Sequence, residues 1–294
     1  MQLKRIFTRM VLLVLLLVIG LNAGRPEPDY GRPALDYAPL QKQIGCFLAG
    51  KPGTYGVYFI DLNSGAQFGY NAYTAFHAAS TFKLPMNLYL YRQAARGRLN
   101  LDEQLVYAPR HLEGGTGVLK SKPPGGSYPV AQLASYSIIY SDNVATNMLL
   151  ERLGRKNVKS FMRSLGGLVV DDEQNVTCPH DLALYMRETL QFARSRHPEG
   201  KILLEDLFNA QFKERIPYPL PPGTRAANKI GTWPPSNTYN DVAYVVHLER
   251  PYILAVTSKD TPGYYEALEV IRQVSKMVYQ FQSTGGSRPP AKAV

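Results

Sequence analysis

The stretch FHAASTFKLP, residues 76–85, lies where the hydrophobic pattern of the chain changes its period. Before it, residues 54–62 alternate as in a β-strand and end in the turn signal Asn63-Ser64-Gly65. A returning strand is expected over residues 67–73. After the stretch, up to about residue 212, the pattern is mainly helical. Residues 76–85 therefore connect a strand region to a helical region.

Working outward, further elements are expected on both sides of this junction. Strand character returns late in the chain, over Arg225–Lys229, Asp241–Leu248 and Tyr252–Thr257. Because strands lie at both ends, one sheet must be assembled from distant segments. The sequence predicts an α+β fold, with a helical lobe over about residues 80–212 and a cleft where the lobes meet. Helices are expected over Leu40–Leu48, Met86–Arg96, Val130–Leu153, Val158–Leu165, His180–Ala193, Leu203–Phe208 and Tyr264–Phe281.

Length and composition are those of a globular protein. The chain has 294 residues, of which 45% are hydrophobic and 19% charged. The formal net charge of +10 is partly located in the two terminal segments, and no nucleic-acid-binding motif accompanies it. We expect no nucleic-acid partner, and a basic surface compatible with anionic polymers of the cell envelope.

The N-terminal segment resembles an export signal. Lys4, Arg5 and Arg9 precede an apolar run over Met10–Leu21, which is too short for a typical membrane span. We expect residues 1–24 to be a signal peptide or an uncleaved membrane anchor, followed by a Pro/Gly-rich linker over 25–33. The folded domain is expected over 34–283, outside the cytoplasmic membrane, and a disordered tail over 284–294.

The two cysteines, Cys46 and Cys178, leave their pairing open. A disulfide is possible in an oxidising compartment, but two buried free thiols are favoured, because distance in sequence does not indicate distance in space. Neither the cysteines nor the five histidines have the spacing of zinc ligands, and H-x-H and H-E-x-x-H are absent. We therefore expect no metal and no cofactor.

The first chemical signal is Ser80-Thr81-Phe82-Lys83. Positions i and i+3 share one face of a helix, so that the hydroxyl and the amine could touch. A serine needs a base to become a nucleophile, and a lysine can act as that base only if its pKa is lowered by burial or by a nearby cation. Taken alone, the motif also fits an ordinary surface serine and lysine.

Two further signals follow along the chain. Ser141-Asp142-Asn143 interrupts an apolar helical stretch with three polar residues, which also fits a helix kink or cap. Lys229-Ile230-Gly231-Thr232 lies on an expected strand, where a glycine lets another backbone approach closely. By itself this third signal also fits a strand that ends in a turn.

The order S-x-x-K, S-D-N and K-[TS]-G describes the penicillin-recognising serine enzymes. On these three motifs the chain resembles the class A β-lactamase family and its D-alanyl-D-alanine peptidase relatives, from about Leu40 to Phe281. The resemblance implies a β-lactamase/transpeptidase-like fold, in which an antiparallel sheet is flanked by N- and C-terminal helices and joined to a helical lobe. It also implies a monomer that takes a β-lactam or a peptidoglycan stem peptide as substrate.

By this resemblance, Ser80 is the acylated nucleophile and Lys83 the base for acylation, although the identity of that base is disputed. Ser141 and Lys229 would carry the proton to the leaving nitrogen, and Asn143 would bind a substrate amide.

The backbone N–H groups of Ser80 and Thr232 would form the oxyanion hole, beside Gly231.

Two departures from the family pattern affect the expected mechanism. Ile230 replaces a hydroxyl residue that would contact the substrate carboxylate, and Thr232 and Ser236 are the nearest replacements. The loop over 165–179 is short and lacks the E-x-x-L-N element that carries the deacylating glutamate; Glu173 is the nearest glutamate and is not assigned that role. We therefore expect slow β-lactam hydrolysis, and a D-alanyl-D-alanine carboxypeptidase or transpeptidase as the alternative.

Other classes remain as alternatives. A penicillin-binding sensor without turnover would share the same site, but no second folded domain is evident to transmit a signal. A Ser-His-Asp hydrolase using His77 is disfavoured, because no G-x-S-x-G surrounds Ser80.

Overall fold

The computed structural model describes residues 35–286. The predicted signal or anchor over 1–24, the linker over 25–33 and the tail beyond residue 286 lie outside the described residues. The helices are α2 (Ala38–Ala49), α3 (Lys83–Ala94), α4 (Val130–Ile139), α5 (Asn143–Leu153), α6 (Arg155–Ser164), α7 (Pro179–Arg194), α8 (Pro198–Phe208) and α9 (Tyr264–Thr284). The strands are β1 (Thr54–Asp61), β2 (Gln67–Tyr70), β3 (Phe76–His77), β4 (Gln104–Val106), β5 (Ser127–Pro129), β6 (Val176–Thr177), β7 (Ala226–Trp233), β8 (Thr238–Val245) and β9 (Tyr252–Lys259).

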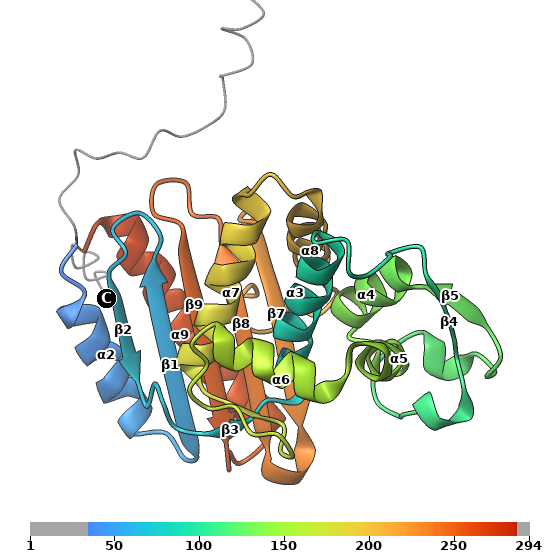
Figure 1. The fold of residues 1–294 in the computed structure, drawn as a ribbon. Coiled ribbons are helices and arrows are strands. Elements are labelled where there is room, and N and C mark those ends of the chain that lie inside the picture. The colour runs from blue at the N-terminus through green and yellow to red at the C-terminus, as the bar shows by residue number, and fades with distance from the viewer. Residues whose placement is uncertain (1–34, 287–294) are drawn as a thin grey trace, which may run out of the picture. The chain divides into compact units, whose positions relative to one another are not determined.

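The main sheet joins the two ends of the chain. Its strand order is β2-β1-β9-β8-β7, and all of its strand pairs are antiparallel. At its centre, β1 pairs along its whole length with β9, so that Val57 lies opposite Val256. The α+β fold with an antiparallel sheet built from distant segments is therefore confirmed (Figure 1).

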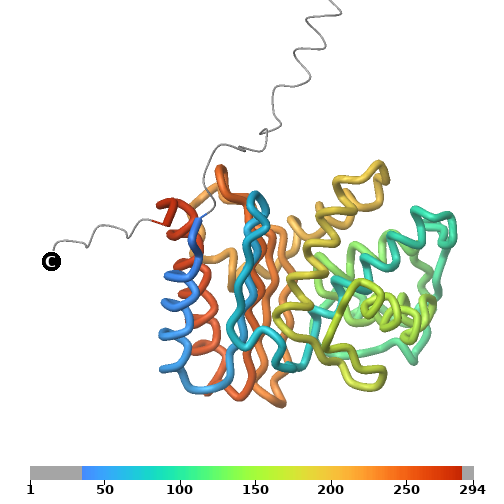
Figure 2. The backbone as a smooth tube through the Cα atoms, turned by 60° about the vertical axis from the view of Figure 1, so that its left-hand side comes forward, coloured from blue at the N-terminus to red at the C-terminus, as the bar shows by residue number. Residues whose placement is uncertain are grey.

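Alternating side chains of the strands supply two cores, because successive residues of a strand point to opposite faces. In β1, Val57 and Phe59 belong to the core beneath α2 and α9, whereas Tyr58 and Ile60 belong to the core shared with the helical lobe. Figure 2 shows the resulting layers: the two terminal helices, the sheet, and then α7 with the rest of the helical lobe. The cleft between sheet and lobe opens beside β7.

One long helix was expected over Val130–Leu153, and this prediction is wrong. The structure contains α4 and α5 instead, separated by Tyr140–Asp142. Ser141 has a left-handed φ of 52°, and the carboxylate of Asp142 caps α5 by accepting from the backbone N–H of Ala145. The polar Ser-Asp-Asn residues therefore end one helix and begin the next.

Both cysteines are free thiols. Cys178 is buried, as expected, but Cys46 is exposed, so the prediction of two buried thiols holds for only one. The chain's last helix extends to Thr284 and ends at Gly285, whose φ of 60° suits a helix C-cap. Within residues 35–286, none of the helices combines the length and the apolar character needed to cross a bilayer.

Candidate active site

Ser80 lies in a short 3-10 helix, η1 (Ala79–Phe82), between β3 and α3. Ala79 before it has a φ of 48°, which a residue with a Cβ adopts at a cost. The hydroxyl of Thr81 donates to the carbonyl of Ala78 over 2.6 Å and closes the turn. This turn leaves Ser80 half-buried and lining a pocket of about 540 Å³.

Lys83, the first residue of α3, is almost completely buried, with 3% of its surface exposed. Its Nζ donates to the carbonyl of Ser141 over 2.6 Å, to Asn143 Oδ1 over 2.7 Å and to Ser141 Oγ over 3.2 Å. Burial lowers the pKa of Lys83 to about 7, against the opposing effects of the Asp142 and Glu113 carboxylates. The amine can therefore lose its proton near neutral pH.

The contact expected between the Ser80 hydroxyl and the Lys83 amine is not made in the described structure, since no hydrogen bond joins them. Both residues nevertheless line the same pocket. In ligand-free sites such catalytic hydrogen bonds are often long, and they tighten only when substrate binds. The amine is instead held by Ser141 and Asn143.

Lys229 reaches the same serine from the sheet. Its Nζ donates to Ser141 Oγ over 2.9 Å and to the carbonyl of Ile230 over 3.2 Å. Burial, and then the charge of Lys83, hold the pKa of Lys229 well below its ordinary value. The three separate motifs thus meet at one hydroxyl, that of Ser141.

Asn143 connects this network to the opposite loop. Its Oδ1 accepts from Lys83, and its Nδ2 donates to the carbonyl of Gly114 over 2.7 Å. Beside it, the fully buried Asp142 accepts from the backbone N–H groups of Val118 and Leu119, over 2.6 and 2.8 Å. The Ser-Asp-Asn turn therefore fixes both the helix start and the loop that faces it.

The strand β7 forms the other wall. A Cβ on Gly231 would lie 2.7 Å from the carbonyl oxygen of Ala78, which explains the glycine at this close approach. Ile230 is buried, and Thr232 is exposed and lines the pocket. The hydroxyl of Ser236 instead shares a hydrogen bond with Thr238 Oγ1, so that only Thr232 offers a hydroxyl to this pocket from β7.

Arg215, which the sequence did not single out, supports this wall from behind. It is 1% exposed, and its Nη1 donates to the carbonyls of Gly231 and Asn240 over 2.7 and 2.5 Å. Its Nη2 donates to Thr232 Oγ1 over 2.5 Å. Because the Thr232 oxygen accepts from Arg215, the hydroxyl proton is free to point elsewhere. Arg215 lies in an irregular segment between α8 and β7, where no sequence pattern indicates burial.

The loop between α6 and α7 closes the pocket near Ser80. Lys159 Nζ donates to the carbonyl of Gln174 over 3.0 Å, and Asn175 Nδ2 donates to the carbonyl of Ala79 over 3.2 Å. Asp171 accepts from the backbone N–H of Gln174, and Glu173 is exposed. Among the described residues of this loop, only Asn175 lines the pocket.

His77 has a structural position. Its Nδ1 accepts from the backbone N–H of Ala79 over 3.1 Å, and its ring stacks on Trp233 with centroids 4.3 Å apart. Burial lowers the pKa of His77. In the described structure no hydrogen bond links it to Ser80, which argues against a Ser-His-Asp arrangement.

One group of side chains has the composition of a metal site. The ligand atoms of Cys178, His180 and Asp181 lie within 4.8 Å of one another. The Asp181 carboxylate, however, accepts from the backbone N–H groups of Leu168 and Val169. Because these hydrogen bonds join the start of α7 to the loop that precedes it, we assign these residues a structural role.

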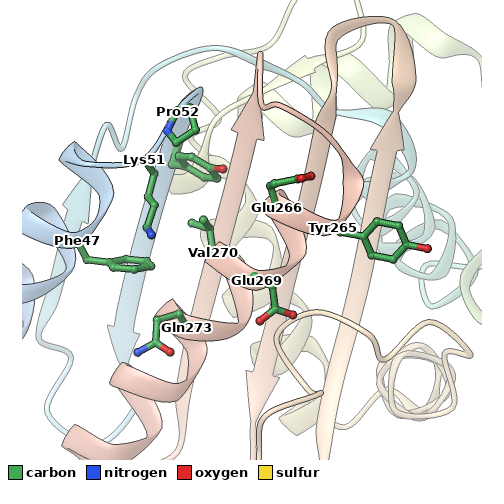
Figure 3. Close-up of a pocket in the computed structure, with 9 residues that line it drawn as sticks. Phe47, Lys51, Pro52, Tyr265, Glu266, Glu269, Val270 and Gln273 are labelled. Carbon is green, nitrogen blue, oxygen red and sulfur yellow. The ribbon is translucent and has the colours of Figure 1, made fainter.

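A second hollow of about 620 Å³ lies between α2 and α9 (Figure 3). Its lining includes Phe47, Lys51, Glu266 and Glu269, but it contains no serine, cysteine or histidine. This hollow therefore offers no nucleophile, in contrast to the Ser80 pocket.

Comparisons with known proteins agree with this geometry. Residues 39–282 match the family described as "Beta-lactamase enzyme family". The chain is 26% identical to Beta-lactamase SME-1 of Serratia marcescens over 251 residues, which are 78% of this chain and 84% of that protein. It is 26% identical to a beta-lactamase of Mycobacterium tuberculosis over 285 residues, or 88% and 91% of the two chains.

Among solved structures, PBP-A superimposes with a TM-score of 0.79 and 28% identity, covering 85% of this chain and all of PBP-A. A mutant of PBP-A, solved as an acyl-enzyme complex with penicillin G, also superimposes with a TM-score of 0.79. The two chains are 29% identical, and the superposition covers 86% of this chain and all of the mutant.

Proposed function

The chain belongs to the beta-lactamase enzyme family, and we propose that it acts on β-lactams through an acyl-enzyme formed on Ser80. It is a serine hydrolase of the class A β-lactamase type, as the three motifs predicted. The proposal concerns which residues act, how fast the acyl-enzyme is released, and where the protein works.

The observation that carries the proposal is the meeting of Lys83 and Lys229 at Ser141, with Lys83 lining the same pocket as Ser80. Lys83, whose pKa is lowered to about 7, takes the proton of the Ser80 hydroxyl as Ser80 attacks the lactam carbonyl. Ser141 then passes a proton to the leaving nitrogen, supported by Lys229. The backbone N–H groups of Ser80 and Thr232 stabilise the oxyanion, where one such donor is typically worth about 3–4 kcal/mol.

Asn143 and Thr232 bind the two ends of the substrate. Asn143, already oriented by Lys83 and by the carbonyl of Gly114, offers its amide to the substrate's acyl side. Thr232, whose oxygen accepts from Arg215, donates its hydroxyl proton to the substrate carboxylate and so replaces the hydroxyl missing at Ile230. Arg215 acts through Thr232 and is a positioning residue.

We propose that deacylation is slow. The loop between α6 and α7 contributes an amide, Asn175, to the pocket, whereas its carboxylates Asp171 and Glu173 do not line it. Water near the ester therefore lacks a general base from this loop. Glu113 lines the pocket from the opposite loop, where Asn147 Nδ2 donates to its Oε2 over 2.8 Å.

The same observation favours a second candidate, a D-alanyl-D-alanine carboxypeptidase or transpeptidase. When its acyl-enzyme forms, the C-terminal D-alanine leaves the site, whereas the leaving nitrogen of an opened β-lactam stays attached to the acyl group. Water or an amine can therefore gain access to the peptidyl ester, with Lys83 as base. A penicillin-binding sensor without turnover is the remaining alternative. The release of D-alanine from a peptide ending in D-Ala-D-Ala separates the peptidase from the sensor.

The N-terminal sequence supports a further proposal, that residues 1–24 export the chain, and that a monomer acts outside the cytoplasmic membrane, free or anchored. N-terminal sequencing of the protein from membrane and soluble fractions tests this. An uncleaved, fully cytoplasmic chain would contradict it.

Intact-mass spectrometry after incubation with penicillin G tests the proposed mechanism. We expect an adduct of the mass of penicillin that persists for minutes and that maps to Ser80. S80A should form no adduct, and Ser160→Ala, on the exposed side of α6, should behave as the unaltered chain. Rapid loss of the drug without an adduct would contradict slow deacylation, and neither adduct nor drug loss would contradict the proposed site.

A further inference from the structure

The Ser80 pocket continues along α5, away from the nucleophile. Asn143, Thr146, Asn147 and Leu150 line it at positions i, i+3, i+4 and i+7, which is one face of the helix. Over these seven residues the helix rises about 10 Å. An acyl side chain bound to Ser80 can therefore run along this face with its carbon atoms against Leu150.

Two opposite charges lie along this extension. Glu113 is the only carboxylate among the described residues that line the pocket, and Arg155, the first residue of α6, lines it as well. Both side chains are exposed. No ion pair joins them within residues 35–286, so each remains available to a ligand.

Only one of the two carboxylate oxygens of Glu113 accepts a hydrogen bond in the described structure. Its Oε2 accepts from Asn147 Nδ2 over 2.8 Å, and Asn147 also donates to the carbonyl of His111 over 3.2 Å. The other oxygen of Glu113 has no hydrogen-bond donor in the described structure. The guanidinium of Arg155 likewise has no acceptor there. A carboxylate that is held in place and a free guanidinium on one pocket suit a ligand carrying both charges.

We propose that this extension selects substrates whose acyl side chain ends in an amino-acid group, with the ammonium beside Glu113 and the carboxylate beside Arg155. This inference rests on the proposed acylation of Ser80. It names the substrate class on the acyl side, whereas the opposite end of the pocket, at Thr232, takes the carboxylate next to the scissile bond. Leu150 and Thr146 contact the intervening chain.

Three penicillins distinguish the contribution of the ammonium from that of the carboxylate. Penicillin N has a D-α-aminoadipyl side chain, which ends in an amino-acid group. Adipyl penicillin lacks only its ammonium, and 5-aminopentanoyl penicillin lacks only its terminal carboxylate. We expect the second-order acylation constant for penicillin N to exceed each of the others by about fivefold, as for an exposed charge pair of good geometry.

Variants assign each preference to one side chain. Glu113→Gln should abolish the preference over adipyl penicillin and keep that over 5-aminopentanoyl penicillin, and Arg155→Gln should do the reverse. Glu173→Gln and Lys156→Gln are the controls. Each removes an exposed charge of the same sign as Glu113 or Arg155 that does not line the pocket, and each should leave both ratios unchanged. Because the Glu113 charge also raises the pKa of Lys83, E113Q alters acylation by all substrates alike, and this effect cancels in the ratios.

The outcomes are distinguishable from failure of the proposed function. Equal constants for the three penicillins, or preferences that survive in both variants, would overturn this inference while acylation by penicillin G still stands. If no penicillin acylates Ser80, the proposed function itself is wrong and this inference is overturned with it.

Discussion

The amines of Lys83 and Lys229 flank the hydroxyl of Ser141 at 3.2 and 2.9 Å. Both lysines are buried, and two ammonium groups around one hydroxyl would repel each other in this low-dielectric site. Burial lowers the pKa of both, and the charge of Lys83 further lowers that of Lys229. The Lys83 amine can therefore be neutral near pH 7, as proton transfer from Ser80 to it requires.

The pH dependence of acylation should follow Lys83. Its amine acts as a base only when neutral, and its pKa is about 7. For penicillin G, whose charge does not change between pH 5 and 9, kcat/KM should therefore fall about tenfold per pH unit below 7 and level off above it. Stopped-flow acylation between pH 5 and 9 measures this. In E113Q, which lacks a carboxylate that raises the pKa, the inflection should move to lower pH. A profile flat from pH 5 to 9 would exclude Lys83 as the base.

Thr232 should control binding of the substrate carboxylate. T232V removes a hydroxyl whose oxygen is fixed by Arg215, and we expect KM to rise about tenfold with little change in kcat, as for one hydrogen bond to a charged group. T232S keeps the hydroxyl and should keep KM within about twofold. If T232S is as impaired as T232V, the methyl group and its packing are responsible, and not the hydroxyl.

The three motifs could be predicted from the sequence because each is a short local pattern whose order identifies the family. Their meeting at Ser141 also depends on a helix break that the sequence did not predict. The left-handed backbone at Ser141 ends α4, although the apolar periodicity of residues 130–153 favours a continuous helix. Periodicity reports the buried face of both helices and is insensitive to a short break that leaves both faces buried.

Arg215 was missed for a different reason. It follows Glu214 in an irregular segment, and charged residues in such segments are usually exposed. Its burial comes from acceptors contributed by other elements, the carbonyls of Gly231 and Asn240, whose distance from Arg215 in space cannot be inferred from the sequence. The end of β7 at Thr232 is thus supported by a residue that only the tertiary structure identifies.

Gly231 should tolerate no side chain. In G231A the new Cβ would lie 2.7 Å from the carbonyl oxygen of Ala78 and 3.1 Å from the backbone nitrogen of Thr81. We expect β7 to move away from η1, with acylation reduced by at least about 100-fold, since the oxyanion donors must be held at hydrogen-bond distance. Because the clash is with backbone atoms, the melting temperature should fall as well.

The matched control for G231A is Gly50→Ala, outside the pocket, where a Cβ would meet only the carbonyl oxygen of Phe47, at 3.9 Å. This variant should acylate as the unaltered chain does. Normal acylation by G231A would show that β7 can shift without harm, and that the close approach to Ala78 is not required.

Asp142 should be essential for stability. Its carboxylate is fully buried and accepts three backbone N–H groups, those of Val118, Leu119 and Ala145. In D142N an amide NH₂ must face at least one of these donors, so the free energy of unfolding in urea should fall by about 2–3 kcal/mol. Asp260→Asn, at an exposed left-handed position that asparagine adopts readily, should cost far less. Equal stability of the two variants would contradict this role.

Asp206 offers a test at the far side of the helical lobe. Burial raises the pKa of its carboxyl from 3.8 to about 6, although Ser135 Oγ donates to it over 2.8 Å. A raised pKa means that the folded chain binds this proton more tightly than the unfolded chain. Protonation of Asp206 therefore stabilises the folded chain below about pH 4, and this contribution is lost as the pH rises to about 6.

D206N keeps an acceptor for Ser135 without the charge, so above pH 6 its free energy of unfolding should exceed that of the unaltered chain, by at most about 3 kcal/mol. Near pH 4 the two should converge. Urea unfolding at pH 4 and pH 7.5 measures this, with Asp102→Asn at the exposed end of the β4 turn as the control that should show no such difference. If D206N loses as much stability at pH 7.5 as at pH 4, the Asp206 carboxylate is stabilised by its surroundings and is not destabilised by burial.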